Sequence, residues 1–426
     1  MSDFKICRVL IACLLLAEGG SVLAQDDGIA LEMGEAQTLA VTQQPLLEGL
    51  TAQARAERES AIASAQLPDP QLVGGIQDLP INTEDAGSFT ADSFTMLQIG
   101  VMQEFPRAAK RQLRGELRNQ EAERLEADHH LADRSIRRDA GLAWLELWRY
   151  DQARSLTRAS LREAEAQVAA VEIALKTGTA TQAELLTARV EAGRLRDAVA
   201  GTEQSLEHAR NGLSRWIGEA AFRPVCPDLP TSPALPTLAA ALERVRSHPH
   251  LGGLQVQIAE AQTGAALAKA DYAPDWRVEL GYADRPAFSE MVTLRIGIDL
   301  PVFTRDRQDR GLAAALAKGE AAQSAMQDAL RQLESEARLN LQDSARLRER
   351  LRDYDESLLP QSASRIEAAI AGWGAGRNAL REVLDGRRAA LELQMARLEL
   401  QHDAAKRVVQ LHYLGAYDGV AENTHE

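Results

Sequence analysis

The stretch 292-VTLRIGIDLPVFTRDRQ-308 predicts β structure, because its first half alternates apolar and polar residues. A period of two is the pattern of a β-strand with one apolar and one polar side. A second stretch, 96-MLQIGVMQEFPRAAKRQ-112, has the same alternation and also ends in a proline and a basic run. The sequence therefore carries one kind of strand twice, far apart in a chain whose other segments have mostly helical patterns.

The composition favours helices that pack closely through small side chains. The 426 residues are 45% hydrophobic but only 4% aromatic, and much of the apolar content is alanine and leucine. The net charge of -14 comes with no basic stripe, which argues against a nucleic-acid partner.

The N-terminus has the features of a signal peptide over residues 1–24. Lys5 and Arg8 precede an apolar run that is too short to span a bilayer, and Ala24 suits a signal-peptidase site. We expect cleavage near Ala24 and export. Cys13 leaves lipidation of the N-terminus open. After cleavage near Ala24, Cys226 is the remaining cysteine, so the mature chain forms no internal disulfide.

An internal repeat organises the rest of the chain. Residues 45–70 align without gaps on residues 249–274, and later glycines also match. The matched pairs include Leu47 with Leu251, Gly49 with Gly253, Leu50 with Leu254, Gln53 with Gln257, Ile99-Gly100 with Ile296-Gly297, Gly178 with Gly376 and Gly218 with Gly415. We therefore expect one repeat over 25–222, a proline-rich connector over 223–238, a second repeat over 239–418 and a tail over 419–426.

Each repeat is expected to contain a helix, a β-hairpin and a long helical hairpin. The β-hairpins are predicted at about 70–105 and about 275–301, and the helical tips near 178 and 376. The long helical stretches are predicted from about 108 to 176 and from about 306 to 371. At 1.5 Å per residue the longer one reaches roughly 100 Å, so the fold class is mainly α, with rods packed side by side in a tube or bundle.

The strands have about the length that a tilted strand needs to cross hydrocarbon. Aromatic residues gather around them, as in interfacial belts, at positions 89, 94, 105, 272, 276, 282, 288 and 303. The alternative is two half-buried hairpins on a water-soluble domain. If the strands lie in lipid, four of them leave open edges, and three chains are the smallest number that closes a wall around an aqueous bore.

The segments 67-LPDP-70, 98-QIGVMQEFPRAAKR-111, 175-LKTGTATQAELL-186 and 372-GWGAGRNALREVL-384 resemble the outer-membrane factor family typified by TolC. The segments 67–82 and 95–106 are most similar to its heavy-metal branch, the CzcC and CusC type. The resemblance implies a homotrimer with a twelve-stranded transmembrane β-barrel and a periplasmic coiled-coil tunnel. It also implies partners: outer-membrane lipid, a periplasmic adaptor (membrane fusion protein) and an inner-membrane resistance-nodulation-division pump. The implied function is passive conduction of exported heavy-metal cations.

The resemblance also implies site residues at the helical tips. Adaptor contacts fall on the turn residues Gly178, Thr179, Gly376 and Arg377, and the channel entrance on Glu184, Arg381, Glu382 and Asp385. The chain departs from the family at Asn378, where the family's type member has a basic gating residue.

The residues themselves leave other roles open. Thr181 and Glu184 have the spacing of a helix-capping box, which explains Glu184 without a gate. Glu382 and Asp385 share one helical face, where solvation is the default role. His129-His130 point apart on a helix, and His248 precedes a proline at a helix start, so neither favours a metal site. Trp144, Trp148 and Trp216 have the spacing of helix-packing residues.

The sequence contains no enzyme motif and predicts no cofactor. The alternative function is a soluble periplasmic coiled-coil scaffold or a pump adaptor. An adaptor normally has one helical hairpin between globular β domains, whereas this chain is expected to have two equivalent helical hairpins.

Overall fold

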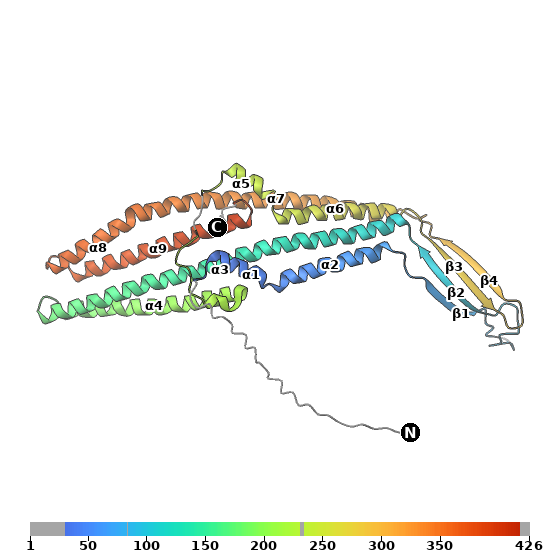
Figure 1. The fold of residues 1–426 in the computed structure, drawn as a ribbon, viewed down its shortest axis with the longest axis horizontal. Helices are drawn as coiled ribbons and strands as arrows, with labels where there is room; N and C mark the ends of the chain where they lie inside the picture. Colours follow the sequence, from blue (N-terminus) through green and yellow to red (C-terminus); the bar gives the residue numbers. More distant parts are fainter. Residues whose placement is uncertain (1–29, 83, 231–233, 418–426) are drawn as a thin grey trace, which may run out of the picture.

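The computed structural model describes residues 30–82, 84–230 and 234–417, and over these residues the chain forms an elongated rod. Long helices run side by side along it, and a sheet extends from one end (Figure 1). The expected signal peptide, residues 231–233 of the expected connector and the tail lie outside the described residues. Among the described residues, no helix is both long and apolar enough to cross a membrane.

The first half of the chain follows the expected order of helix, β-hairpin and helical hairpin. Its elements are α1 (Met33–Thr42), α2 (Pro45–Ala65), β1 (Gln71–Gln77), β2 (Met96–Phe105), α3 (Ala108–Lys176), α4 (Gln182–Ile217) and the 3₁₀ helix η1 (Gly218–Phe222). The 69 residues of α3 have the bounds that the sequence predicts.

The second half repeats this order with one interruption. Its elements are α5 (Leu238–Val245), α6 (Pro249–Ala270), β3 (Trp276–Asp284), β4 (Met291–Ile298), α7 (Gln308–Asp353), the π-helix η2 (Tyr354–Leu358), α8 (Leu359–Gly374) and α9 (Leu380–Tyr413).

The expected continuous helix from about 306 to 371 is corrected by the structure, which widens it at η2. Pro360 explains the change. It has no N–H to donate, and its ring would clash with the carbonyl of Glu356 in a regular helix. The wider π turn absorbs the clash, and the backbone N–H of Leu359 instead bonds the carbonyl of Tyr354.

The strands form one four-stranded antiparallel sheet in the order β1-β2-β3-β4. The two β-hairpins of one chain therefore form a single continuous sheet. In it, Val101 of β2 lies opposite Leu72 of β1 and Leu280 of β3. Within this sheet β1 and β4 are the edges.

The two faces of the sheet differ in polarity, as the period of two predicts. Residues directly opposite in register lie on the same face. One face carries Leu72, Ile76, Leu97, Ile99, Val101, Trp276, Leu280, Tyr282, Val292, Leu294, Ile296 and Ile298, all of them exposed. The other face is largely polar and includes an ion pair of 3.0 Å between Arg295 and Glu279.

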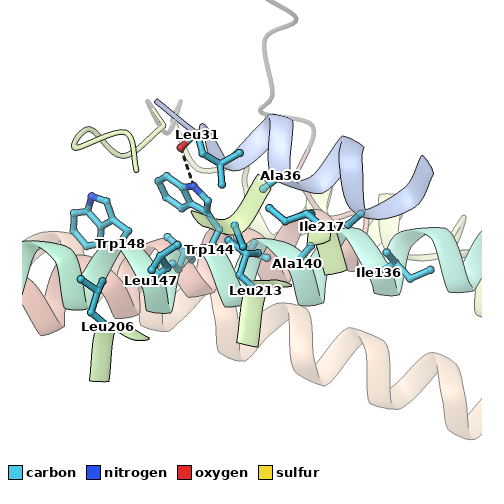
Figure 2. Close-up of a cluster of buried hydrophobic side chains, with 14 of the residues drawn as sticks. Leu31, Ala36, Ile136, Ala140, Trp144, Leu147, Trp148, Leu206, Leu213 and Ile217 are labelled. Atoms are coloured by element: carbon cyan, nitrogen blue, oxygen red, sulfur yellow. Dashed lines mark hydrogen bonds between the residues drawn. The ribbon is translucent and has the colours of Figure 1, made fainter. Parts of the chain in front are cut away.

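The largest buried cluster lies where α1, α3 and α4 meet (Figure 2), midway along the rod (Figure 1). The indole Nε1 of Trp144 donates to the carbonyl of Leu31 at 3.0 Å, and that of Trp148 donates to the carbonyl of Pro227 at 2.8 Å. Trp216 packs at the edge of the same cluster. The packing role predicted for the tryptophans is confirmed, and Trp148 also fastens the segment after η1 to α3.

Candidate functional site at the helical tips

The turn between α3 and α4, here called the α3/α4 tip (residues 174–184), reverses the chain through Gly178, whose φ is +78°. The backbone N–H of Thr179 bonds the carbonyl of Ala174 at 2.8 Å, and that of Gly178 bonds the carbonyl of Leu175 at 3.1 Å. These two bonds around a left-handed residue define a Schellman motif. Glycine is favoured here because a Cβ is strained at this φ.

The turn between α8 and α9, the α8/α9 tip (residues 372–382), has the same backbone. Gly376 has a φ of +68°, the N–H of Arg377 bonds the carbonyl of Gly372 at 2.9 Å, and that of Gly376 bonds the carbonyl of Trp373 at 2.9 Å. The two repeats therefore share the same turn, with the same backbone hydrogen bonds at matching positions. Both tips lie at the end of the rod opposite the sheet (Figure 1).

The helices that follow the two turns start differently. At the α3/α4 tip, Thr181 Oγ1 accepts from the backbone N–H of Glu184 at 3.2 Å, and the Glu184 carboxylate accepts from the backbone N–H of Thr181 at 2.8 Å. The predicted capping box is thus confirmed. At the α8/α9 tip the matching positions are Ala379 and Glu382, and Ala379 has no side chain that could cap α9.

One apolar cluster joins the two tips. Val171 of α3 and Leu185 of α4 are buried together with Leu380 and Leu384 of α9, and Trp373 packs against them. Because these residues come from both repeats, burial of this cluster holds the two helical hairpins together at the end where they turn.

The acidic positions of the expected entrance lie in unlike surroundings. The Glu184 carboxylate is occupied by its capping bonds. Asp385 is exposed between two guanidinium groups, with Arg381 at 3.5 Å and Arg388 at 3.7 Å. Glu382 is exposed on the same face of α9, one position after Arg381.

An ion pair that the sequence analysis missed crosses between the repeats beside these residues. Arg388 of α9 donates to the carboxylate of Glu191 of α4 at 2.6 Å. This hydrogen bond with Glu191 raises the pKa of the Arg388 guanidinium, so the group stays charged. The sequence holds no local signal for this pair, since its members lie on different helical hairpins.

Asn378 is half-buried and folds back onto α8. A Cβ placed on Gly372 would lie 2.5 Å from its Nδ2 atom, so the glycine leaves room for this side chain. Asn378 therefore has a packing role within its own tip.

The histidines considered in the sequence play structural or peripheral parts. The rings of His129 and His130 meet edge to face with centroids 5.8 Å apart. His248 caps α6, because its Nδ1 accepts from the backbone N–H of His250. In the described residues, the side chains that converge as metal ligands do are instead those of Glu399, His402 and Asp403 on α9.

No family model and no curated protein sequence matches the chain. Solved structures do match. The outer membrane protein VceC from Vibrio cholerae is 19% identical, with a TM-score of 0.73 over 90% of this chain and 96% of that one. CusC is 17% identical, with a TM-score of 0.74 over 93% and 94%. The CmeC outer membrane channel from Campylobacter jejuni is 13% identical, with a TM-score of 0.74 over 97% and 94%.

The chain has the fold of the outer-membrane factor channels. These matches extend over nine-tenths or more of the chain. The TM-scores with CusC and CmeC are equal, so the outer-membrane factor fold by itself does not single out the heavy-metal branch.

Proposed function

We propose that this protein is the outer-membrane channel of a tripartite efflux system and that it works as a homotrimer. The observation that carries the proposal is the sheet, which combines an exposed apolar face with two open edges at the end of a helical rod. An apolar face of this size suits lipid, and the polar face suits a wet lumen.

The open edges require further copies of the chain. In hydrocarbon, each unpaired backbone N–H and C=O costs several kcal/mol, so β1 and β4 must be paired by neighbours. Two chains would give eight strands, whose side chains fill their own interior, whereas three chains give twelve strands and room for water.

The internal repeat supplies the register of that pairing. Val101 lies between Leu72 and Leu280 in the sheet. In the second repeat, Ile298 corresponds to Val101 and Trp276 corresponds to Leu72, and these two residues are paired in the same way. On its open side, Ile298 should therefore face the counterpart of Leu280. By the alignment of 70 with 274, that counterpart is Ile76 of a neighbouring chain.

Cysteine cross-linking tests both the trimer and the register. In a Cys226→Ser background, the pair Ile76→Cys and Ile298→Cys should form a ladder that ends at the trimer on a non-reducing gel of membranes. The matched control joins Ile76→Cys to Val292→Cys, which lies on the same face but several residues away along β4. A ladder that ends at the dimer, or equal cross-linking in the control, contradicts the proposal.

The proposed cargo is heavy-metal cations, with Glu382 and Asp385 near the entrance. Carboxylates brought together around a threefold axis attract cations. The exposure of Glu382 supports this role, whereas the capping bonds of Glu184 favour a structural role for that residue. In planar bilayers, the double change Glu382→Gln and Asp385→Asn should lower cation selectivity. Unchanged reversal potentials across a salt gradient would exclude the role.

The proposed partners are a periplasmic adaptor, meeting the turns at Gly178, Thr179, Gly376 and Arg377, and an inner-membrane resistance-nodulation-division pump. The four turn residues are exposed at the end of the rod away from the sheet, which supports this assignment. Localisation in the outer membrane, with the helical rod in the periplasm, is part of the proposal. Recovery of the protein in the soluble periplasmic fraction without detergent would favour the scaffold alternative.

A further inference from the structure

Three potential metal ligands converge on one face of α9. Glu399, His402 and Asp403 are three and four positions apart, which places them on adjacent turns of one helical face. One ligand atom from each residue lies within 4.8 Å of the other two. The cluster lies far from the tips, on the stretch of α9 that faces α3 near Trp144.

The histidine is buried beside Glu146, but that contact leaves one of its ring nitrogens without a hydrogen-bond partner among the described residues. His402 is 1% exposed, its Nε2 pairs with the Glu146 carboxylate, and its Nδ1 makes no hydrogen bond with any described residue. A buried polar group without a partner costs free energy, so the ring points to a ligand that completes it.

The surroundings of the ring assign its two nitrogens different roles. Nε2 lies 3.2 Å from the Glu146 carboxylate of α3, and this interaction lowers the pKa of Glu146 to about 2. Nδ1 lies on the side of Asp403, 3.9 Å from its carboxylate. A metal-binding histidine usually directs its second nitrogen at a carboxylate, which fixes the tautomer and the ring orientation. Glu146 is placed for that positioning role.

A nearby arginine limits but does not block the site. Arg149 donates to Glu146 at 2.8 Å and to the Oε2 atom of Glu399 at 3.0 Å. The second oxygen of Glu399 is left for an ion. The side chains of Glu399 and Asp403 are 52% and 45% exposed, so both can rotate to bring their oxygens closer to the ring, as a bound ion requires.

We propose that His402 Nδ1, with one oxygen each from Glu399 and Asp403, binds a divalent first-row transition cation such as Zn²⁺ or Co²⁺. An imidazole with two carboxylates is a common ligand set for these ions, whereas Mg²⁺ and Ca²⁺ prefer oxygen ligands alone. Water fills the remaining coordination positions. The site does not depend on the proposed channel function, since it is complete within one chain.

The test uses the full-length protein purified in detergent, with Co²⁺ as a spectroscopic probe and Zn²⁺ in calorimetric titration. We expect one ion per chain, visible absorption from bound Co²⁺, and a higher midpoint of thermal unfolding with Zn²⁺. His402→Asn should abolish the Co²⁺ spectrum and the Zn²⁺-dependent shift. Asp403→Asn changes a partly exposed residue and should weaken Zn²⁺ binding while leaving the midpoint without metal unchanged.

Two further variants separate the proposed roles. Glu146→Gln should weaken Zn²⁺ binding by roughly 10- to 100-fold, as expected for a positioning residue, while Co²⁺ absorption persists at saturation. His208→Asn, on an exposed position of α4, is the matched control and should bind like the unmodified protein. Equal binding by the unmodified protein and His402→Asn, or no binding by the unmodified protein, overturns the proposal.

Discussion

The two helical tips share one backbone turn but differ in how the next helix begins. Both reverse through a left-handed glycine with matching Schellman bonds, yet Thr181 caps α4 while Ala379 leaves α9 without a side-chain cap. The difference decides what the following glutamate does. Glu184 is held by the cap, whereas Glu382 is exposed on α9. Two repeats with the same backbone turn can thus place equivalent acids in different surroundings, and the roles proposed for the two glutamates differ accordingly.

The same contrast extends along the helices. The first repeat runs through α3 without a break, whereas the second is widened at η2 before Pro360. The position of α3 that aligns with Pro360 is Arg162, by the match of Gly178 with Gly376. This difference between the two long helices therefore depends on one position, which can be exchanged by mutation.

The largest expected effect comes from breaking α3. Arg162→Pro removes a helical hydrogen bond and places the ring against the carbonyl of Arg158, so it should destabilise the protein by about 3 kcal/mol or more. The measurement is the midpoint of unfolding followed by circular dichroism. Arg162→Ala is the control and should cost under about 1 kcal/mol. A small effect of the proline would mean that α3 tolerates the same widening as η2.

The second comparison concerns the start of the helix before each β-hairpin. His248 caps α6 through Nδ1 and lies 3.1 Å from the carbonyl of Tyr413 through Nε2, while the aligned Gln44 makes no side-chain cap to α2. Burial, together with the charge of Arg134, lowers the pKa of His248 to about 4. The neutral ring suits this site, because a proton on Nδ1 would remove the cap.

This shift makes stability depend on pH in a defined window. The unfolded chain protonates His248 below about pH 6.5, and the folded chain does so only near pH 4, so stability is lost as the pH falls between these values. The loss should reach ~3 kcal/mol. His248→Asn keeps a capping oxygen and should flatten this part of the pH profile of thermal unfolding. His250→Asn is the control, and identical profiles for all three proteins would contradict the assignment.

The repeat and its alternating strands could be predicted because their signals lie in short segments of the sequence. Val292 to Ile298 alternate strictly, and Gly178 and Gly376 mark turns by their residue type alone. Trp144 and Trp148 could likewise be placed in the core from their helical spacing.

What the sequence did not reveal depends on residues that meet only after folding. The pair Glu191 and Arg388, and the approach of Glu146 to His402, join different helices. The widening at η2 was not predicted, although Pro360 is a local signal against a regular helix.

The smallest expected effect exchanges the caps of the two tips. Thr181→Ala removes the hydroxyl that receives the backbone N–H of Glu184, and should destabilise the protein by about 1 kcal/mol. Ala379→Thr supplies the same hydroxyl three residues before Glu382, completes the capping box and should stabilise by a similar amount. Both changes are read from the midpoint of thermal unfolding.

The exchange also tests whether the two glutamates have separate roles. Thr181→Ala releases Glu184, while Ala379→Thr draws the Glu382 carboxylate back to the backbone of residue 379. If exposed carboxylates select cations at the entrance, Ala379→Thr should lower cation selectivity in planar bilayers even though it leaves the net charge unchanged. Thr181→Ser, which keeps the cap, should leave selectivity unaltered. A stabilised Ala379→Thr protein with unchanged selectivity would show that Glu382 does not act on the permeating ions.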